Sequence, residues 1–441
     1  MKLIKIGKKL FPICRSITGD GVRKSLNIIS KYIKNLKVKE IKSGTKVFDW
    51  RVPPEWNIKD AWIKDSKGKK IIDFKKNNLH LVNYSRPIKK ILDKNSLFKK
   101  IYFDKNNKKY IPYVTSYYNL DWGFCLSFND FKKLNSKYES NDDFYVNINS
   151  SFKKNGKLTF ADVIIKGESE REILISTYIC HPSMANNELS GPLLSIKLFN
   201  YFKKRKNNLS IRFVFIPETI GSIAYIAHFK DKLKANVVGG FNLSCVGDER
   251  CYSFLPSKYG NSISDVAALK SYKKNKIRFK KYSFLDRGSD ERQYNSPGID
   301  LPIATMMRSK YGTYKEYHSS GDVFGRVVTE RGLAQSHKVI KDAIIYIDEE
   351  YKKNKKVIQK KIRKKLKYPV AKYICEPQMG KRNLYPKRGN QTRPLLIRNM
   401  MDFLQYADGS NSLNKISNFI KKDIQTTKKI HKILLKHKLI L

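Results

Sequence analysis

The 441-residue sequence lacks the cysteine patterns that mark a disulfide framework or a structural zinc site. Its six cysteines form no Cys-x-x-Cys pair, and most of them lie in apolar runs. Such cysteines are typical of reduced, buried thiols. No stretch of about 18 apolar residues occurs, and the N-terminus has no apolar run of signal-peptide length. We therefore expect a cytoplasmic protein without a membrane span.

Acidic residues are scarce relative to basic ones. The chain has 39 Asp and Glu against 90 Lys and Arg, a net charge of +51. A charge of this size attracts nucleic acid, anionic membranes or acidic polymers. The lysines are, however, spread along the whole chain instead of being concentrated on one element together with arginine and aromatic residues. We interpret the charge as a compositional bias and predict no specific nucleic-acid partner.

The hydrophobic content of 41% allows a sizeable core. Residues 1–36 have a helical pattern, and short strand-like runs separated by turn residues in 37–150 predict a small all-β insert. Strands and helices alternate in 151–355, which predicts an α/β domain with a mostly parallel sheet. Residues 356–390 are basic and punctuated by proline, as in a linker. Residues 391–441 have the pattern of three helices.

One stretch of the predicted α/β domain carries two residues of metal-binding type. The apolar run Ile173–Ile179 predicts a buried strand, and a helical pattern opens at Leu193. His181 and Glu188 lie in the loop between them, at the edge of the sheet where ligands bind in open α/β folds. Both are common metal ligands. A tight turn with a surface histidine would give the same local pattern.

Further polar residues follow the next predicted strands. Glu218 comes after the run Ile211–Ile216, and Asp248 after Val237–Leu243. His318 is one of only seven histidines in the chain. A hydrolytic metal site needs histidine or carboxylate ligands, an open position for water and a carboxylate base. Each residue alone would fit an ordinary surface charge or helix cap, but their joint occurrence at strand ends predicts one site.

Two arginines and an aspartate follow closely in the chain, at Arg287, Asp290 and Arg292. Arginine is suited to a bidentate grip on a carboxylate, so these residues would orient a substrate. A structural network of salt bridges is the alternative.

Five motifs occur in a fixed order: CHPSMANNELSGP, FIPETIGS, SCVGDE, GSDERQY-NSPGIDLP and YGTYKEYHSSGD. Together they resemble a bacterial family of aminopeptidase-like proteins that share the fold of the two-zinc aminopeptidases. The opening LFPICRSITGDGVRKSL resembles the first helix of that family. The resemblance extends over nearly the whole chain. It implies a zinc-peptidase-like α/β domain, a β insert, a C-terminal winged-helix-like domain and a link to surface-polysaccharide biosynthesis.

The resemblance also implies roles for single residues. His181 resembles the first zinc-binding histidine of those peptidases, and His318 resembles the last. Their acidic ligand is usually the Asp of an Asn-Asp-Asn-Leu-Ser-Gly pattern. Here Asn187 occupies that position and Glu188 is its neighbour. We favour Glu188 as the ligand because a carboxylate holds a divalent cation better than an amide does.

Two further carboxylates complete the implied site. Glu218 resembles the glutamate that acts as general base or second ligand, but Pro217 replaces the first member of the usual glutamate pair. Asp248 resembles the third carboxylate. The missing carboxylates predict one zinc ion instead of two. The implied function is a zinc-dependent hydrolase that cleaves an amide or peptide bond in a small-molecule or peptide-like substrate, with Glu218 as base.

Other functions remain open from the sequence. A degenerate homologue would bind a ligand at the same place without turnover. A nucleic-acid-binding protein would use the basic charge and the C-terminal helices, of which the third would enter the DNA major groove. Little sequence remains after that helix for a wing, so we favour a packing or protein-interaction role for residues 391–441. The sequence is also compatible with a homo-oligomer.

Overall fold

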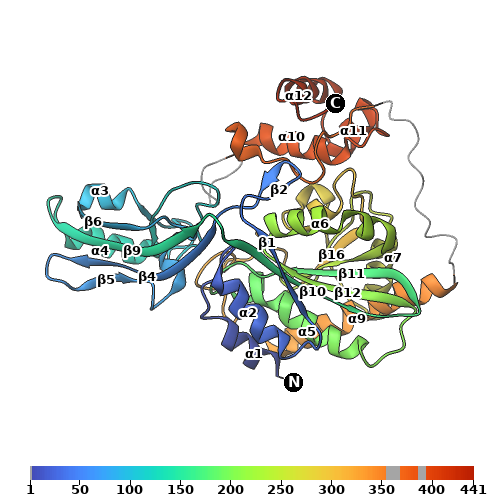
Figure 1. Ribbon diagram of the computed structural model, residues 1–441, viewed down its shortest axis with the longest axis horizontal. Helices are drawn as coiled ribbons and strands as arrows, with labels where there is room; N and C mark the ends of the chain where they lie inside the picture. Colours follow the sequence, from blue (N-terminus) through green and yellow to red (C-terminus); the bar gives the residue numbers. More distant parts are fainter. Residues whose placement is uncertain (1, 354–367, 386–393) are drawn as a thin grey trace.

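A computed structural model describes residues 2–353, 368–385 and 394–441, and its centre is an eight-stranded sheet (Figure 1). The four central strands run parallel. Two antiparallel pairings extend the sheet on one side, and on the other side an antiparallel pairing is followed by a parallel one. In order across the sheet the strands are β1 (Lys37–Lys42), β10 (Lys157–Ile165), β12 (Leu209–Ile216), β11 (Ser169–Tyr178), β13 (Val237–Asn242), β16 (Ile303–Met307), β14 (Ser253–Leu255) and β15 (Lys280–Lys281).

Helices cover both faces of this sheet, which explains why β12 is buried along its whole length. Neighbouring residues of β11 point to opposite faces: Ile173 and Ile175 pack with α1, α2, α5, α7 and α9, whereas Leu174 packs with α6. The predicted α/β domain with a mostly parallel sheet is confirmed. The helices are α1 (Leu3–Leu10), α2 (Asp20–Ser30), α5 (Ser190–Phe202), α6 (Ile220–Asn236), α7 (Ile263–Lys274), α8 (Glu291–Tyr294) and α9 (Glu330–Lys353).

The insert forms a second, four-stranded antiparallel sheet that projects to one side of the large sheet (Figure 1). In order, its strands are β5 (Lys70–Asp73), β4 (Glu55–Asp65), β9 (Asp143–Lys153) and β6 (Ile88–Asp93). Short elements accompany it: the hairpin β2 (Lys46–Val47) and β3 (Trp50–Arg51), the pair β7 (Ile101–Tyr102) and β8 (Phe124–Cys125), and the helices α3 (Lys94–Phe98) and α4 (Phe128–Lys137).

Two features differ from the predicted all-β insert over 37–150. Strand β1 belongs to the large sheet, because Val38 pairs with Ala161 of β10. The insert also contains helices: Ser127 caps α4 by accepting a hydrogen bond from the backbone N–H of Asp130. The short strand-like runs of the sequence did not reveal which sheet each strand joins. The other predicted domain boundaries stay predictions.

The C-terminal helices form a compact unit above the α/β domain in Figure 1. They are α10 (Leu395–Tyr406), α11 (Leu413–Ile420) and α12 (Ile424–Lys436), and they share one apolar cluster. Within the described residues, none of the helices combines the length and the apolar character that crossing a membrane requires.

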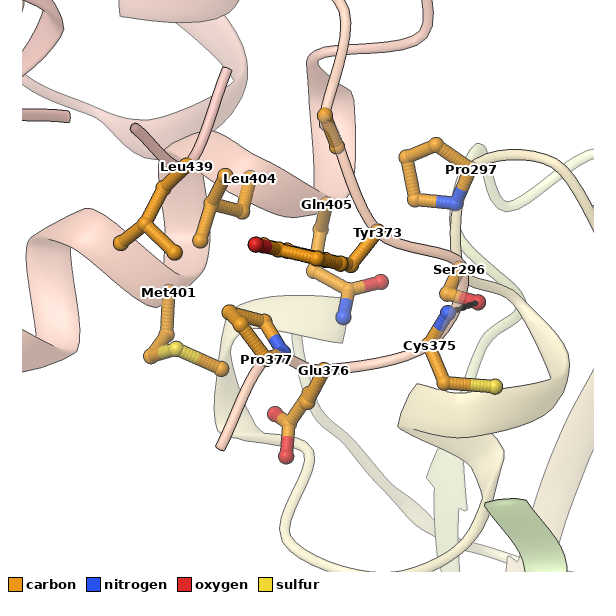
Figure 2. A pocket seen from close by; sticks show the side chains of 11 residues that line it. Ser296, Pro297, Tyr373, Cys375, Glu376, Pro377, Met401, Leu404, Gln405 and Leu439 are labelled. Atoms are coloured by element: carbon orange, nitrogen blue, oxygen red, sulfur yellow. Dashed lines mark hydrogen bonds between the residues drawn. The ribbon is translucent and has the colours of Figure 1, made fainter. Parts of the chain in front are cut away.

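The predicted linker, 356–390, is described only over residues 368–385, and the remainder lies outside the described residues. Figure 2 shows its stretch from Tyr373 to Pro377 passing between Ser296 of the α/β domain and Met401 of α10. The backbone N–H of Cys375 donates to Ser296 Oγ at 3.1 Å. This segment, followed by the short 3-10 helix Met379–Arg382, is therefore packed between the two domains.

Candidate active site

A cavity of about 580 Å³ lies where the loops after β11 and β12 meet the insert and the linker. Six aromatic side chains line it, together with two histidines and four charged residues. The aromatic residues are Trp50, Tyr113, Tyr117, Tyr118, Tyr317 and Tyr385, and the others are His181, His318, Glu218, Arg292, Glu376 and Lys381. The cavity is thus at the carboxyl edge of the parallel strands, as the sequence predicts.

His181 is oriented by one carboxylate, that of Glu188, and faces a second, that of Glu218. The buried strand β11 ends at Tyr178, and the chain then turns so that the His181 ring lies almost fully buried. Its Nδ1 is 2.8 Å from Glu188 Oε2, and its Nε2 is 3.7 Å from Glu218 Oε2. Burial opposes protonation, but the hydrogen bond and the charge of Glu188 raise the pKa of His181 above its usual value. Nδ1 is therefore engaged, and Nε2 faces Glu218 at the cavity.

Glu188 lies in a π-helical turn, Ala185–Leu189, that is buried throughout. Its Oε1 is 3.6 Å from Nε of Arg15, and the same Nε donates to the carbonyl oxygen of His181 at 2.9 Å. Arg15 is completely buried and also donates to the carbonyl oxygen of Leu10. A buried carboxylate is stable only when its charge is compensated in this way. Arg15 thus ties Glu188 and the backbone of His181 into one unit.

The loop that carries Glu218 is strained and is held by residues from α8 and its N-terminal flank. Thr219 has φ 64° and ψ −78°, a conformation that surrounding contacts must maintain. Asp290 Oδ1 accepts hydrogen bonds from the Thr219 N–H at 2.8 Å and the Ser222 hydroxyl at 2.7 Å. Nη2 of Arg292 donates to Thr219 Oγ1 at 2.6 Å. Asp290 and Arg292 therefore position the Glu218 loop, and Arg292 also lines the cavity.

Two carboxyl groups at this loop are more easily protonated than usual. Burial raises the pKa of Glu218, although His181 and Arg292 oppose the shift. Burial and the charge of Glu218 raise the pKa of Asp290 to about 7. Raised carboxyl pKa values in a cavity are a mark of functional sites.

His318 lies beside His181, with ring centres 5.4 Å apart. Its ring stacks on that of Tyr317 at 4.0 Å, and the Tyr113 ring contacts both histidines edge-on, at 5.0 and 5.2 Å. Burial and the neighbouring His181 hold the pKa of His318 well below its usual value. His318 is therefore a neutral imidazole that is available as a ligand.

Asp248 is placed elsewhere, and its two carboxylate oxygens are fully engaged. They accept hydrogen bonds from the backbone N–H groups of Arg250 and Ser309, from the Ser309 hydroxyl and from Asn186 Nδ2, at 2.8 to 3.0 Å. Asp248 does not line the cavity. Its contacts support the turn that carries Asn186.

Arg287 also lies outside the cavity lining. Its guanidinium forms an ion pair with Asp402 of α10 at 2.7 Å and donates to the carbonyl oxygen of Met401. Both ion-pair side chains are buried, so the contact joins the α/β domain to the C-terminal unit. This is the structural salt bridge that the sequence left as an alternative for this group of residues.

Three side chains could offer metal ligands on the Nδ1 side of His181. Cys180, His181 and Glu188 place ligand atoms within 4.8 Å of one another. An ion there would break the hydrogen bond between His181 and Glu188 and share the carboxylate with Arg15. Burial also raises the pKa of Cys180 well above its usual value, which keeps it a neutral thiol. Asn187 Oδ1 accepts from the Tyr178 hydroxyl at 3.1 Å, and its Nδ2 is buried without a hydrogen-bond partner among the described residues.

Sequence reasoning missed one acidic residue of the cavity, Glu376, which the linker contributes. Its Oε2 lies 3.4 Å from Arg292 Nε and accepts from Gln293 Nε2 at 3.1 Å. The only signal for Glu376 in the sequence is that Cys375-Glu376-Pro377 interrupts an otherwise basic segment with a cysteine, a residue type that is usually buried. Arg15 was missed too, although the resemblance of the N-terminal motif included it.

Comparison with known proteins supports the fold. A relative from Clostridium acetobutylicum, named for polysaccharide biosynthesis and an aminopeptidase-like domain, is 43% identical over 411 residues, covering 93% of this chain and 89% of the relative. A crystal structure from the same organism, described as a peptidase, has a TM-score of 0.74 and 39% identity and covers 100% of this chain and 95% of that one.

More distant solved structures share the fold. A zinc aminopeptidase from Bacillus subtilis has a TM-score of 0.58 at 13% identity, covering 78% of this chain and 93% of that one. A Peptidase M28 precursor from Shewanella amazonensis has a TM-score of 0.54 at 10% identity, covering 82% and 95%. The expected fold of the zinc aminopeptidases is therefore confirmed.

Family models cover both parts of the chain. Residues 367–441 match a winged helix-turn-helix, which confirms the nature of the C-terminal unit. Residues 4–350 match a model described as "Domain of unknown function (DUF4910)". The chain belongs to this DUF4910 family, with an aminopeptidase-like fold and a C-terminal winged helix.

Proposed function

We propose that the protein hydrolyses an amide bond in the cavity between His181 and Glu218, with one zinc ion as cofactor. The observation that carries the proposal is the orientation of His181. Its Nδ1 is fixed by Glu188 at 2.8 Å, so Nε2 is left facing Glu218 at 3.7 Å. Histidines that bind catalytic metals are commonly oriented by a carboxylate on the other ring nitrogen.

The spacing of the two histidine rings suits a single ion. Two imidazoles bound to one zinc at about 2.1 Å place their ring centres about 5 Å apart. The ring centres of His181 and His318 are 5.4 Å apart, and His318 is neutral. The residues do not provide for a second ion, because Asp248 is engaged by four donors and Asn187 stands where a carboxylate would be needed. His181 and His318 would therefore hold one ion, more weakly than the usual three protein ligands do.

Glu218 would serve as the general base. A bound zinc ion would supply Lewis acidity toward water and toward the amide carbonyl. Glu218 would accept a proton from water at a carboxylate oxygen and deliver it to the departing amine. Burial raises its pKa, which favours its protonated form after it has taken the proton, and the hydrogen bond from Arg292 to Thr219 holds the adjacent loop in place.

Glu188 and Arg15 would act as positioning residues. This revises the expectation that Glu188 is itself a zinc ligand. Its Oε2 already holds Nδ1 of His181, and its Oε1, which accepts no hydrogen bond from the described residues, lies 3.6 Å from the positively charged Arg15, which opposes a cation there. In this proposal the buried charges of Glu188 and Arg15 do not bind the ion but orient the imidazole of His181 that does.

The substrate would be a saccharide that carries an amide. Six aromatic residues line the cavity, and aromatic rings pack well against the apolar C–H faces of sugar rings while tyrosine hydroxyls bond to sugar hydroxyls. The name of the Clostridium acetobutylicum relative, which refers to polysaccharide biosynthesis, supports the same class.

Hydrolysis is tested with amide substrates in the presence of added zinc. Chitotetraose, a chain of four N-acetylglucosamine units, and a set of aminoacyl p-nitroanilides are incubated with the full chain, and released acetate or amine is measured. Glu218→Gln should lower the rate by about 10²–10⁴-fold, as expected for loss of a general base. Glu170→Gln is the matched control, because Glu170 is exposed near the start of β11, the strand that leads to His181.

The same assay can also contradict the proposal. Equal rates for wild type and Glu218→Gln would contradict the assignment of the base. No turnover of any substrate by zinc-loaded wild type would favour a degenerate homologue that binds a ligand without hydrolysing it. Asn187, an amide where the resembling peptidases have a carboxylate, is consistent with that alternative.

A further inference from the structure

A second hollow adjoins the active-site cavity on the side of the linker. It has a volume of about 760 Å³ and is more open than the cavity. Trp50, Gln378 and Lys381 line both spaces, so the two are neighbours across shared walls. We call this second space the linker groove. Trp50 thus lies at the boundary between the cavity and the linker groove.

The linker groove has firm walls made from two distant segments. One wall is the β2–β3 hairpin, and the other is the linker from Lys372 to Lys381. Asp49, at the hairpin turn, accepts from the Gln378 backbone N–H at 2.8 Å and pairs with Arg382 at 2.6 Å. The indole N–H of Trp50 donates to the carbonyl oxygen of Glu376 at 2.7 Å. These bonds join hairpin and linker.

The charge of the linker groove is strongly positive. Lys46, Arg51, Lys372 and Lys381 line it, and Asp49 is the single acidic lining residue. Asp49 is neutralised by Lys381 and Arg382. For the other three cations, the described part of the chain shows no acidic partner within ion-pair distance, and all three are exposed.

Lysine is common over this whole chain, so charge alone would not identify a site. The linker groove differs from an ordinary lysine-rich surface in two ways. It shares walls with the cavity that holds His181 and Glu218, and it combines the cations with the aromatic rings of Phe48, Trp50 and Tyr373. Rings and cations together suit a ligand that has both flat apolar faces and negative groups.

We propose that the linker groove binds the anionic part of the substrate, through Lys46, Arg51 and Lys372. The substrate class is an oligosaccharide that carries an amide at the cavity and carboxylate or phosphate groups on neighbouring sugars. This inference rests on the proposed function and adds the charge of the substrate to it. The shared chemistry is an anion on a sugar ring, and either a uronic acid or a sugar phosphate would supply it.

Binding is measured by calorimetry on Glu218→Gln, so that turnover does not interfere. The probes are hyaluronan tetrasaccharide, which alternates uronate and N-acetylglucosamine, the neutral chitotetraose, and N-acetylglucosamine 6-phosphate. At low salt we expect at least one anionic probe to bind about 10-fold more tightly than chitotetraose, since several exposed ion pairs each contribute modestly. The better anionic probe identifies carboxylate or phosphate as the source.

Two triple variants separate the linker groove from the general charge. Lys46→Gln, Arg51→Gln and Lys372→Gln together should remove the preference for the anionic probe. Lys59→Gln, Lys89→Gln and Lys90→Gln, three exposed lysines of the insert that line neither space, remove the same charge elsewhere and should change binding less than about 2-fold.

Three outcomes would overturn the inference. They are equal affinity for anionic and neutral probes, equal losses in the two triple variants, and tighter binding of a tetraglutamate peptide than of either anionic sugar. Because these measurements record binding without turnover, they are independent of the hydrolysis assay. Failure of hydrolysis in wild type would count against the proposed function, and absence of an anion preference while Lys46, Arg51 and Lys372 are intact would count against the linker groove.

Discussion

Two walls of one cavity are built in contrasting ways. The wall at the carboxyl ends of β11 and β12 places His181 against buried charges, and its partners Arg15 and Glu188 are wholly inaccessible to solvent. The linker wall is joined to the β2–β3 hairpin by bonds nearer the surface, and Lys381 of that wall is 43% exposed. Buried ion pairs tolerate little change, whereas exposed ones contribute little energy. The first wall is thus suited to chemistry and the second to substrate selection.

The largest effect is expected at the centre of the first wall. His181→Ala should abolish stoichiometric zinc binding and lower amide hydrolysis by about 10³-fold or more, because the metal's Lewis acidity is worth several kcal/mol. The measurement is zinc content by elemental analysis together with the hydrolysis rate. His437→Ala is the matched control, because His437 lies at the C-terminal end of α12, in the C-terminal unit. Full zinc content in His181→Ala would show that the ion binds elsewhere.

The buried pair behind His181 should matter most for stability. Arg15→Met and Glu188→Gln each leave one buried charge without its partner, so each should lower the free energy of unfolding by about 3 kcal/mol or more. The double variant should cost clearly less than the sum, because the second change removes the uncompensated charge. Urea unfolding of the four proteins measures this coupling. Strict additivity would mean that Arg15 and Glu188 do not interact.

This first wall is also where the sequence was most informative. His181, Glu218 and His318 follow buried strands or lie in distinctive motifs, and strand ends of a parallel sheet meet at one edge. The predicted strand candidates from Ile173–Ile179 to Val237–Leu243 all lie in the large sheet, next to one another. Because these strands are neighbours in the sheet, residues that follow them in the sequence also lie close together in the structure.

The sequence was least informative where contacts join distant segments. Arg15 reaches Glu188, Arg287 reaches Asp402, and Asp49 reaches Arg382, each across more than 100 residues of chain. Neither hydrophobic periodicity nor motif spacing encodes such contacts. For the same reason the sequence suggested Asp248 as a metal ligand. Only the structure shows that its oxygens accept hydrogen bonds from Asn186 and Ser309.

A smaller effect is expected on metal affinity when the orientation of His181 is loosened. Glu188→Gln, compared with wild type well below its unfolding temperature, should weaken zinc binding by about 10–100-fold, as loss of an outer-shell partner does. The measurement is a competitive zinc titration. His318 remains as a ligand, so binding should be weakened but not lost. Tighter binding in Glu188→Gln would contradict the positioning role.

The smallest effect is expected at the second wall. Asp49→Asn should lower stability by about 1–2 kcal/mol, because Asp49 is buried but its partners Lys381 and Arg382 both reach solvent. Burial alone would raise the pKa of Asp49, but the bonds from Arg382 and Lys381 lower it below its usual value. The stabilisation that ionised Asp49 gives to the folded state should therefore be fully present above about pH 4. It should be lost as the pH falls through the lowered pKa of Asp49 in the folded state.

Unfolding curves for wild type and Asp49→Asn at pH 7 and at successively lower pH check this. The two proteins should differ at pH 7 and converge in acid. A loss at pH 7 as large as that of Arg15→Met would remove the contrast between the two walls.

The central claim is that one ion binds on the Nε2 side of His181, with Glu188 behind the ring. The most direct test is anomalous diffraction at the zinc absorption edge from crystals of the full chain grown with zinc. We expect a single peak bonded to His181 Nε2 and to His318, with Glu188 still hydrogen-bonded to Nδ1. Two peaks, or one peak coordinated by Cys180 and Glu188 on the Nδ1 side, would contradict the account.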